Sequence, residues 1–173
     1  MTDEELLKID ICSRLPYGLK IRYTGSTYDC NIDPSKLNRG DVFDIWLALT
    51  KLAKPILFPV CCLTEEIQFR REKIVSIEII GKMYMPKGTF ENGVFGWNEY
   101  VYDDYQDYYI HWNNLDKTFF ISRDEDPNNY FLGRSVLTIE MIDALDRLMI
   151  DYRGLIDKGL AVSVFDLKEN PYE

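Results

Sequence analysis

The chain has 173 residues, of which 46% are hydrophobic and 14% aromatic, and its net charge is −9. A chain of this length and composition can bury enough apolar surface to fold, so a disordered chain is not expected. The negative charge argues against direct binding to nucleic acid or to an anionic membrane, because both need a basic face.

The N-terminus predicts a helix followed by a hairpin. Thr2 and Glu5 have the spacing of a capping box, so we expect a helix from there to about Arg14. The residues expected on its buried face are Leu6, Ile9 and Cys12 or Ser13. Residues 19–23 and 27–32 are β-like and flank a short loop that contains glycine, which is typical of a hairpin.

The next stretch is ambiguous between helix and strand. Residues 42–53 fit both periodicities, and we favour a strand because turn signals bound the segment. Pro55 and Pro59 enclose an apolar run, so we expect an edge strand or an extended connector there. Thr64 is a predicted helix start, with the helix continuing to about Lys73.

Strands are predicted for the middle of the chain. Residues 74–80 and 82–85 are rich in β-branched and apolar side chains and are divided by Gly81. Residues 108–112 and 118–122 are expected to pair as a second hairpin.

The clearest helix signal lies near the C-terminus. Thr138 is a predicted N-cap, and Arg153 and Gly154 mark a chain break after the helix. Its predicted apolar face is Ile139, Ile142, Leu145, Leu148 and Met149, with Asp146 and Arg147 pointing away. Residues 160–164 alternate as a half-buried strand would. The elements together predict one α+β domain over 1–173, a mainly antiparallel sheet packed by N-terminal and C-terminal helices.

Three short boxes carry a resemblance to a known group of proteins. They are RLPYG at 14–18, KPILFP at 54–59 followed by LTEE at 63–66, and DYRGLI at 151–156 followed by GLA at 159–161. In these boxes the chain resembles a small uncharacterised family encoded in phages, prophages and mobile elements of gut anaerobic bacteria. It departs from the family where KPILFP replaces a KPYLRP-like box and where Val60-Cys61-Cys62 replaces small hydroxyl residues. The resemblance implies no known activity and no catalytic residue.

Arginine side chains are candidates for binding a partner's carboxylate, because the guanidinium group can donate two parallel hydrogen bonds. The candidates are Arg22, Arg39 and Arg153. For Arg153 we favour a structural role, in which it and Asp151 tie the turn after the helix to nearby backbone, with Tyr152 and Leu155 in the core.

An acidic, tyrosine-rich segment is the best candidate for a functional surface. Between 99 and 126 the chain carries eight acidic residues, against Lys117 and Arg123. Tyrosine is enriched at protein interfaces, since it offers a large contact area and a polar tip at low entropy cost. The predicted partner surface is Glu99, Tyr100, Tyr102, Asp103, Asp104, Tyr105, Asp107 and Tyr108. The alternative is a hairpin with its tyrosines on one buried face and solvated acids on the other.

A metal-dependent enzyme is the second hypothesis. Asp103, Asp107 and His111, the only histidine, are possible ligands of a hard metal ion. Asp107 and His111 would share a face of a helix, but the surrounding alternation favours strand and loop, which would separate them. We therefore predict no metal, no cofactor and no catalytic residue, and we expect His111 on the surface of its hairpin.

The acidic N-terminus lacks the basic region of a signal peptide, and no apolar run approaches the roughly 20 residues that span a bilayer. We therefore expect a cytoplasmic protein with reduced cysteines. The function predicted is that of a non-enzymatic accessory protein of a phage or mobile element, which acts through contacts with an unknown protein partner. An acidic mimic that blocks a nucleic-acid-binding protein is a sharper form of this hypothesis.

Overall fold

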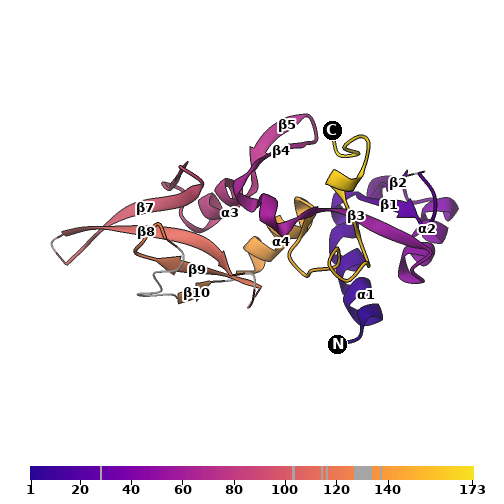
Figure 1. Cartoon of the computed structure of the whole chain (residues 1–173), viewed down its shortest axis with the longest axis horizontal. Coiled ribbons are helices and arrows are strands. Elements are labelled where there is room, and N and C mark those ends of the chain that lie inside the picture. The colour runs from indigo at the N-terminus through magenta and orange to yellow at the C-terminus, as the bar shows by residue number, and fades with distance from the viewer. Residues whose placement is uncertain (28, 103, 114, 116, 127–133, 137) are drawn as a thin grey trace. The chain divides into compact units, whose positions relative to one another are not determined.

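The fold combines helices with mostly antiparallel sheets, which confirms the predicted α+β class (Figure 1). It is given by a computed structural model that describes residues 1–27, 29–102, 104–113, 115, 117–126, 134–136 and 138–173. The chain divides into two compact units. The terminal unit is Met1–Val60, Gln68–Glu72 and Leu145–Glu173, and the central unit is Cys61–Ile67 and Lys73–Ala144. The single domain expected over residues 1–173 stays a prediction.

Within the described ranges, none of the helices has the length and apolar character that crossing a bilayer requires.

The terminal unit is built on a sheet of the order β11-β3-β1-β2, with β12 also paired to β3. The strands are β1 (Leu19–Tyr23), β2 (Asp29–Ile32), β3 (Ala53–Pro59), β11 (Ile150–Asp151) and β12 (Val162–Ser163). The β1–β2 hairpin is as predicted, but β3 lies inside the sheet and not at its edge. Its prolines fit because Pro55 pairs only with β1 and Pro59 only with β11, so each proline has an open side.

Helix α1 (Asp3–Arg14) begins with the predicted capping box, in which Thr2 and Glu5 each accept the other's backbone N–H. Its buried face differs from the prediction. The buried residues are Leu6, Leu7, Asp10, Ile11 and Arg14. Ile9 and Cys12 are exposed. The charged Asp10 and Arg14 lie on the same buried face as the apolar Leu7 and Ile11, so apolar periodicity alone does not identify this face.

Residues 39–49 form helix α2 (Arg39–Leu49), where a strand was favoured. Asn38 caps the helix, and the Asp41 carboxylate accepts a hydrogen bond from the Asn38 N–H. The helix buries Asp44, which accepts hydrogen bonds from the Tyr23 hydroxyl at 2.5 Å and from Cys30 Sγ at 2.9 Å. Its large apolar side chains, Val42, Phe43 and Trp46, are exposed. Polar residues are buried on this helix and large apolar residues are exposed. The apolar pattern therefore does not mark the inner face, which explains why a strand was wrongly predicted.

A two-stranded hairpin, β4 (Glu66–Phe69) and β5 (Glu72–Val75), replaces the helix predicted after Thr64. Its two-residue turn consists of Arg70 and Arg71, with φ of 51° and 69°. The chain also has short 3-10 helices at Leu15–Tyr17, Pro34–Lys36, Val60–Thr64 and Val164–Asp166.

The central unit contains an antiparallel sheet of the order β10-β9-β8-β7-β6. Its strands are β6 (Thr89–Glu91), β7 (Val94–Val101), β8 (Asp104–Asn113), β9 (Thr118–Ser122) and β10 (Arg134–Val136). The predicted β8–β9 hairpin is confirmed. Residues 76–84 form helix α3 (Ser76–Tyr84) and not the predicted strands. Helix and sheet meet at the buried Phe95 ring, which lies against Gly81 and Gly88.

Helix α4 (Ile139–Arg147) is capped as predicted, with the Thr138 hydroxyl accepting the Met141 N–H. Its apolar face is shifted from the prediction. The buried residues on and just after the helix are Met141, Ala144, Leu145, Asp146, Leu148 and Met149, whereas Ile139 is 81% exposed. The prediction that Asp146 points away was therefore wrong.

We predict that Gly81→Ala destabilises the protein by about 1–3 kcal/mol, because a Cβ at this position would meet the Phe95 ring at 2.3 Å. Helix propensity alone would favour alanine by about 1 kcal/mol. The free energy of unfolding in urea measures the change. The same substitution should cost less in a Phe95→Leu background, and an equal cost in both backgrounds would contradict the close approach.

Two substitutions on α4 test which face is buried. Leu145 is fully buried, so Leu145→Ala should lower the free energy of unfolding by about 2–5 kcal/mol. Ile139→Ala, at an exposed position, should change it by less than about 0.5 kcal/mol. Comparable losses for the two variants would show that the assigned face is wrong.

Candidate partner-binding surface

Strands β7 and β8 run beyond the strands that flank them. β6 pairs only with residues 94–96 of β7, and β9 pairs only with residues 109–113 of β8. From the Trp97–Tyr108 pair to the Val101–Asp104 pair, β7 and β8 therefore have only each other as partners among the described strands. Figure 1 shows the two strands continuing together past the end of β9. We call residues 97–102 and 104–108 the arm.

The arm contains every described residue of the predicted partner surface. These are Glu99, Tyr100, Tyr102, Asp104, Tyr105, Asp107 and Tyr108. Asp103 lies outside the described residues. The first part of the acidic, tyrosine-rich segment therefore forms a projecting hairpin.

The tyrosines of the arm are divided between its two faces, because residues opposite one another in register share a face. Tyr100 and Tyr105 are opposite, with ring centroids 5.0 Å apart, and they are 59% and 68% exposed. On the other face Tyr108 stacks on Trp97, with centroids 5.6 Å apart, and is half-buried. The alternative of a single buried tyrosine face is thus wrong for Tyr100 and Tyr105.

Tyr102 lies at the end of the arm and is 95% exposed. Its φ is 54°, a left-handed conformation that is unfavourable for a residue with a large side chain. Backbone strain of this kind is concentrated at functional sites. The strain and the exposed ring mark the tip as a candidate contact point.

An acidic hollow of about 230 Å³ lies at the base of the arm. Glu91, Asp107 and Glu125 line it together with Tyr109, and no lysine or arginine is among its described lining residues. The Tyr109 hydroxyl donates to Glu125 Oε1 at 3.4 Å. Burial raises the pKa of Tyr109, and the carboxylates of Asp107 and Glu125 raise it further. The hollow has the electrostatic character that suits a positively charged group.

A second, more apolar hollow of about 680 Å³ borders the arm. Met85, Pro86, Trp97 and Tyr100 contribute its apolar surface. The Trp97 indole N–H is buried and has no hydrogen-bond partner among the described residues. The base of the arm therefore offers an acidic and an apolar depression close to exposed tyrosines.

The structure separates the described members of the proposed Asp/His metal cluster. Asp107 and His111 lie on one strand, four residues apart, which corresponds to about 13 Å. One ion cannot be bound by both side chains at that spacing. Asp103 lies outside the described residues, and among the described ones no group of three or more histidine, cysteine or acidic residues could hold a metal ion.

His111 is buried, where a surface position was predicted. Its Nε2 lies 2.9 Å from Ser122 Oγ and 3.2 Å from the Asp124 carbonyl oxygen. A hydrogen bond from the ring to this carbonyl requires the proton on Nε2, because a carbonyl oxygen only accepts. Ser122 Oγ itself donates to the Asp124 oxygen at 2.6 Å. In that tautomer Nε2 is not a base toward Ser122.

The cysteines are free, and two of them are unreactive by environment. Burial and a hydrogen bond to Asp44 raise the pKa of Cys30 to about 12. Burial and the neighbouring Cys61 raise the pKa of Cys62 to about 12. Both are thus protonated at neutral pH, whereas a nucleophilic cysteine must be a thiolate.

A buried cluster of charges in the terminal unit was missed in the sequence. Arg14 binds Asp10 through two hydrogen bonds of 2.9 Å, and Arg153 Nη1 donates to Asp10 at 2.9 Å and to Asp146 at 2.7 Å. Burial by itself lowers the pKa of Arg14, but Asp10 outweighs that effect and the pKa is raised. The i, i+4 spacing of Asp10 and Arg14 was the available signal.

The predicted structural role of the third box is correct for Asp151, which accepts the backbone N–H groups of Leu155 and Ile156 at 2.8 Å. Tyr152 and Leu155 are buried as expected. Arg153 binds carboxylates instead of the nearby backbone. Burial raises the pKa of Asp151 despite its hydrogen bonds.

No protein-family model, curated protein or solved structure matches the chain. The resemblance to the family from phages and mobile elements therefore stays a prediction. Two of its boxes are nonetheless brought together in the fold, since Arg14 of the first and Arg153 of the third both bind Asp10.

We predict that lowering the pH from about 7.5 to 5.5 destabilises the protein through His111. Burial lowers the pKa of this histidine in the folded state, so below its ordinary value of about 6.5 the unfolded chain binds a proton that the folded chain does not. The folded state therefore has its full stability above that pH, where His111 is neutral in both states, and loses stability as the pH falls below it. Urea titrations across this range should show a smaller pH dependence for His111→Gln, and an unchanged dependence would contradict the assignment.

Proposed function

We propose that the protein is a non-enzymatic binding protein whose arm contacts a basic protein partner. The observation that carries this proposal is the arm itself, a two-stranded projection with exposed Tyr100, Tyr102 and Tyr105. Large aromatic side chains in solvent are costly unless a partner covers them, and tyrosine is prominent among residues that dominate binding energy.

The arm's isolation also favours a binding role. A two-stranded hairpin without further strands is marginally stable in water, so little energy is gained from the arm as a structural element alone. A partner that packs on it would bury the tyrosine faces and supply the missing contacts.

The negative charges of the arm and of the hollow at its base favour a basic partner. Glu99, Asp104 and Asp107 are exposed on the arm, and the hollow at its base is lined by carboxylates without a cation among the described lining residues. Complementary charge accelerates association and selects the partner. A lysine or arginine side chain would fit the hollow, while the arm's tyrosines cover the neighbouring apolar surface.

The biological setting proposed is the cytoplasm of a bacterial host, with the protein acting as an accessory factor of a phage or mobile element. This part rests on the resemblance in the three boxes. In the sharper form of this proposal, the acidic residues of the arm bind the basic surface with which the partner normally binds nucleic acid. The protein itself is not expected to bind nucleic acid or a membrane.

Neutralising the acidic residues of the arm should weaken the interaction. The variant Glu99→Gln/Asp104→Asn/Asp107→Asn removes three charges, and Glu65→Gln/Glu72→Gln/Glu169→Gln removes three exposed charges elsewhere. After capture from a lysate and purification of the partner, we expect the arm variant to bind at least about tenfold more weakly. The matched control should bind as the wild type does.

The salt dependence provides a second readout, because attraction between exposed charges weakens as ionic strength rises. Binding by the wild type should fall with added NaCl, and binding by the arm variant should depend on it less. Equal recovery of the partner by the wild type and the arm variant would reject the arm as the binding surface.

A further inference from the structure

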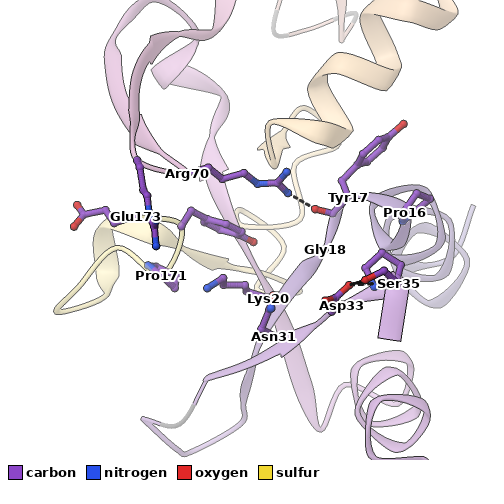
Figure 2. A pocket seen from close by; sticks show the side chains of 13 residues that line it. Pro16, Tyr17, Gly18, Lys20, Asn31, Asp33, Ser35, Arg70, Pro171 and Glu173 are labelled. Carbon is purple, nitrogen blue, oxygen red and sulfur yellow. Dashed lines mark hydrogen bonds between the residues drawn. The ribbon is translucent and has the colours of Figure 1, made fainter. Parts of the chain in front are cut away.

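A cavity of about 570 Å³ opens in the terminal unit, away from the arm in sequence. Its walls come from the start of β1, the end of β2, the β4–β5 turn and the last residues of the chain. In Figure 2 the Arg70 and Lys20 side chains approach the cavity from different sides, with Asp33 and Ser35 toward one end and Pro171 and Glu173 toward the other.

Three cations converge on this cavity in a chain whose net charge is −9. They are Lys20, Arg70 and Arg71, and none of them forms an ion pair among the described residues. Two acidic side chains also line the cavity. Asp33 accepts hydrogen bonds from the Ser35 N–H and hydroxyl, which lower its pKa, and Glu173 is exposed. The cations therefore remain available to an anion.

The two arginines occupy a strained turn. Both central residues of the β4–β5 turn have positive φ, at 51° for Arg70 and 69° for Arg71. Two-residue turns of this kind are normally built from asparagine and glycine, because other side chains are unfavourable there. Arginine at both positions places two cations at the mouth of the cavity.

Arg70 and the C-terminal wall of the cavity are held in place by hydrogen bonds. The Arg70 N–H donates to the Tyr172 carbonyl, and the Arg70 guanidinium donates to the Tyr17 carbonyl. Asn170 Nδ2 donates to the Gln68 carbonyl at 2.7 Å, which ties the C-terminal segment to the hairpin. The buried Tyr172 hydroxyl donates to the Ile56 carbonyl at 2.7 Å. Preorganised donors lose little entropy when a ligand binds.

We propose that this cavity binds a small molecule that carries a phosphate group. Guanidinium and ammonium groups form their strongest hydrogen bonds with such oxyanions, and three cations on different elements match a group with several charged oxygens. The cavity has the size of a small-molecule site and exceeds a single phosphate ion. The remainder of the ligand would lie toward Asn31 and Ser35, whose side chains are polar. This site is independent of the arm and of the function proposed for it.

Calorimetric titration with inorganic pyrophosphate, at constant ionic strength set with NaCl, tests the proposal in the intact protein. Arg71→Gly removes one cation and relieves the positive φ, so the fold should be at least as stable as that of the wild type. Lys51→Gly is the matched control, since Lys51 is exposed, has φ of 64° and does not line the cavity.

We expect pyrophosphate to bind the wild type and Lys51→Gly equally and to bind Arg71→Gly at least about tenfold more weakly. Lys20→Gln should weaken binding in the same direction. Thermal melts should show a pyrophosphate-dependent rise in Tm for the wild type that Arg71→Gly lacks. Absence of binding to the wild type up to about 10 mM, or equal weakening in Arg71→Gly and Lys51→Gly, would overturn the proposal.

Discussion

Two arginines and two aspartates of the terminal unit neutralise one another away from solvent, and the packing of both ends of the chain depends on them. Arg14 is fully buried and donates to Asp10 and to the Ile150 carbonyl, so helix α1 is fixed to the segment that follows α4. Arg153 joins Asp10 to Asp146. A buried charge is tolerated only when it is paired, and loss of one partner typically costs about 3–5 kcal/mol. The cluster therefore fixes which faces of α1 and α4 turn inward.

The two proposed sites have opposite charge and lie in different units. The arm of the central unit presents carboxylates and tyrosines, whereas the cavity of the terminal unit collects Lys20, Arg70 and Arg71. In each site a residue with positive φ is placed where its side chain is available, Tyr102 on the arm and the arginine pair at the cavity.

Several local signals were read correctly, although the predicted helix start at Thr64 was wrong, since β4 begins at Glu66. The capping box of Thr2 and Glu5, the Thr138 cap and the β8–β9 hairpin were all expected from spacing. Helices α2 and α3 were mistaken for strands. In α2 the buried residues include Asp41 and Asp44, so the apolar periodicity does not describe the inner face. In α3 the β-branched residues suggested a strand, but tertiary packing against Phe95 outweighs that weak propensity.

The sequence by itself determined the α+β class and the acidic, tyrosine-rich stretch, because composition, caps and turn spacing act over a few residues. Only the tertiary structure decided that the first part of this stretch forms an arm beyond the sheet. β6 and β9 pair with β7 and β8 only in the part of the sheet next to the arm, and neither pairs with the arm itself. The cavity was likewise invisible in the sequence, where Lys20 lies 50 residues before the adjacent Arg70 and Arg71 and no motif joins them. Its cations meet because Arg70 on the hairpin turn is hydrogen-bonded to the Tyr17 carbonyl just before β1, which is a long-range contact that no local pattern encodes.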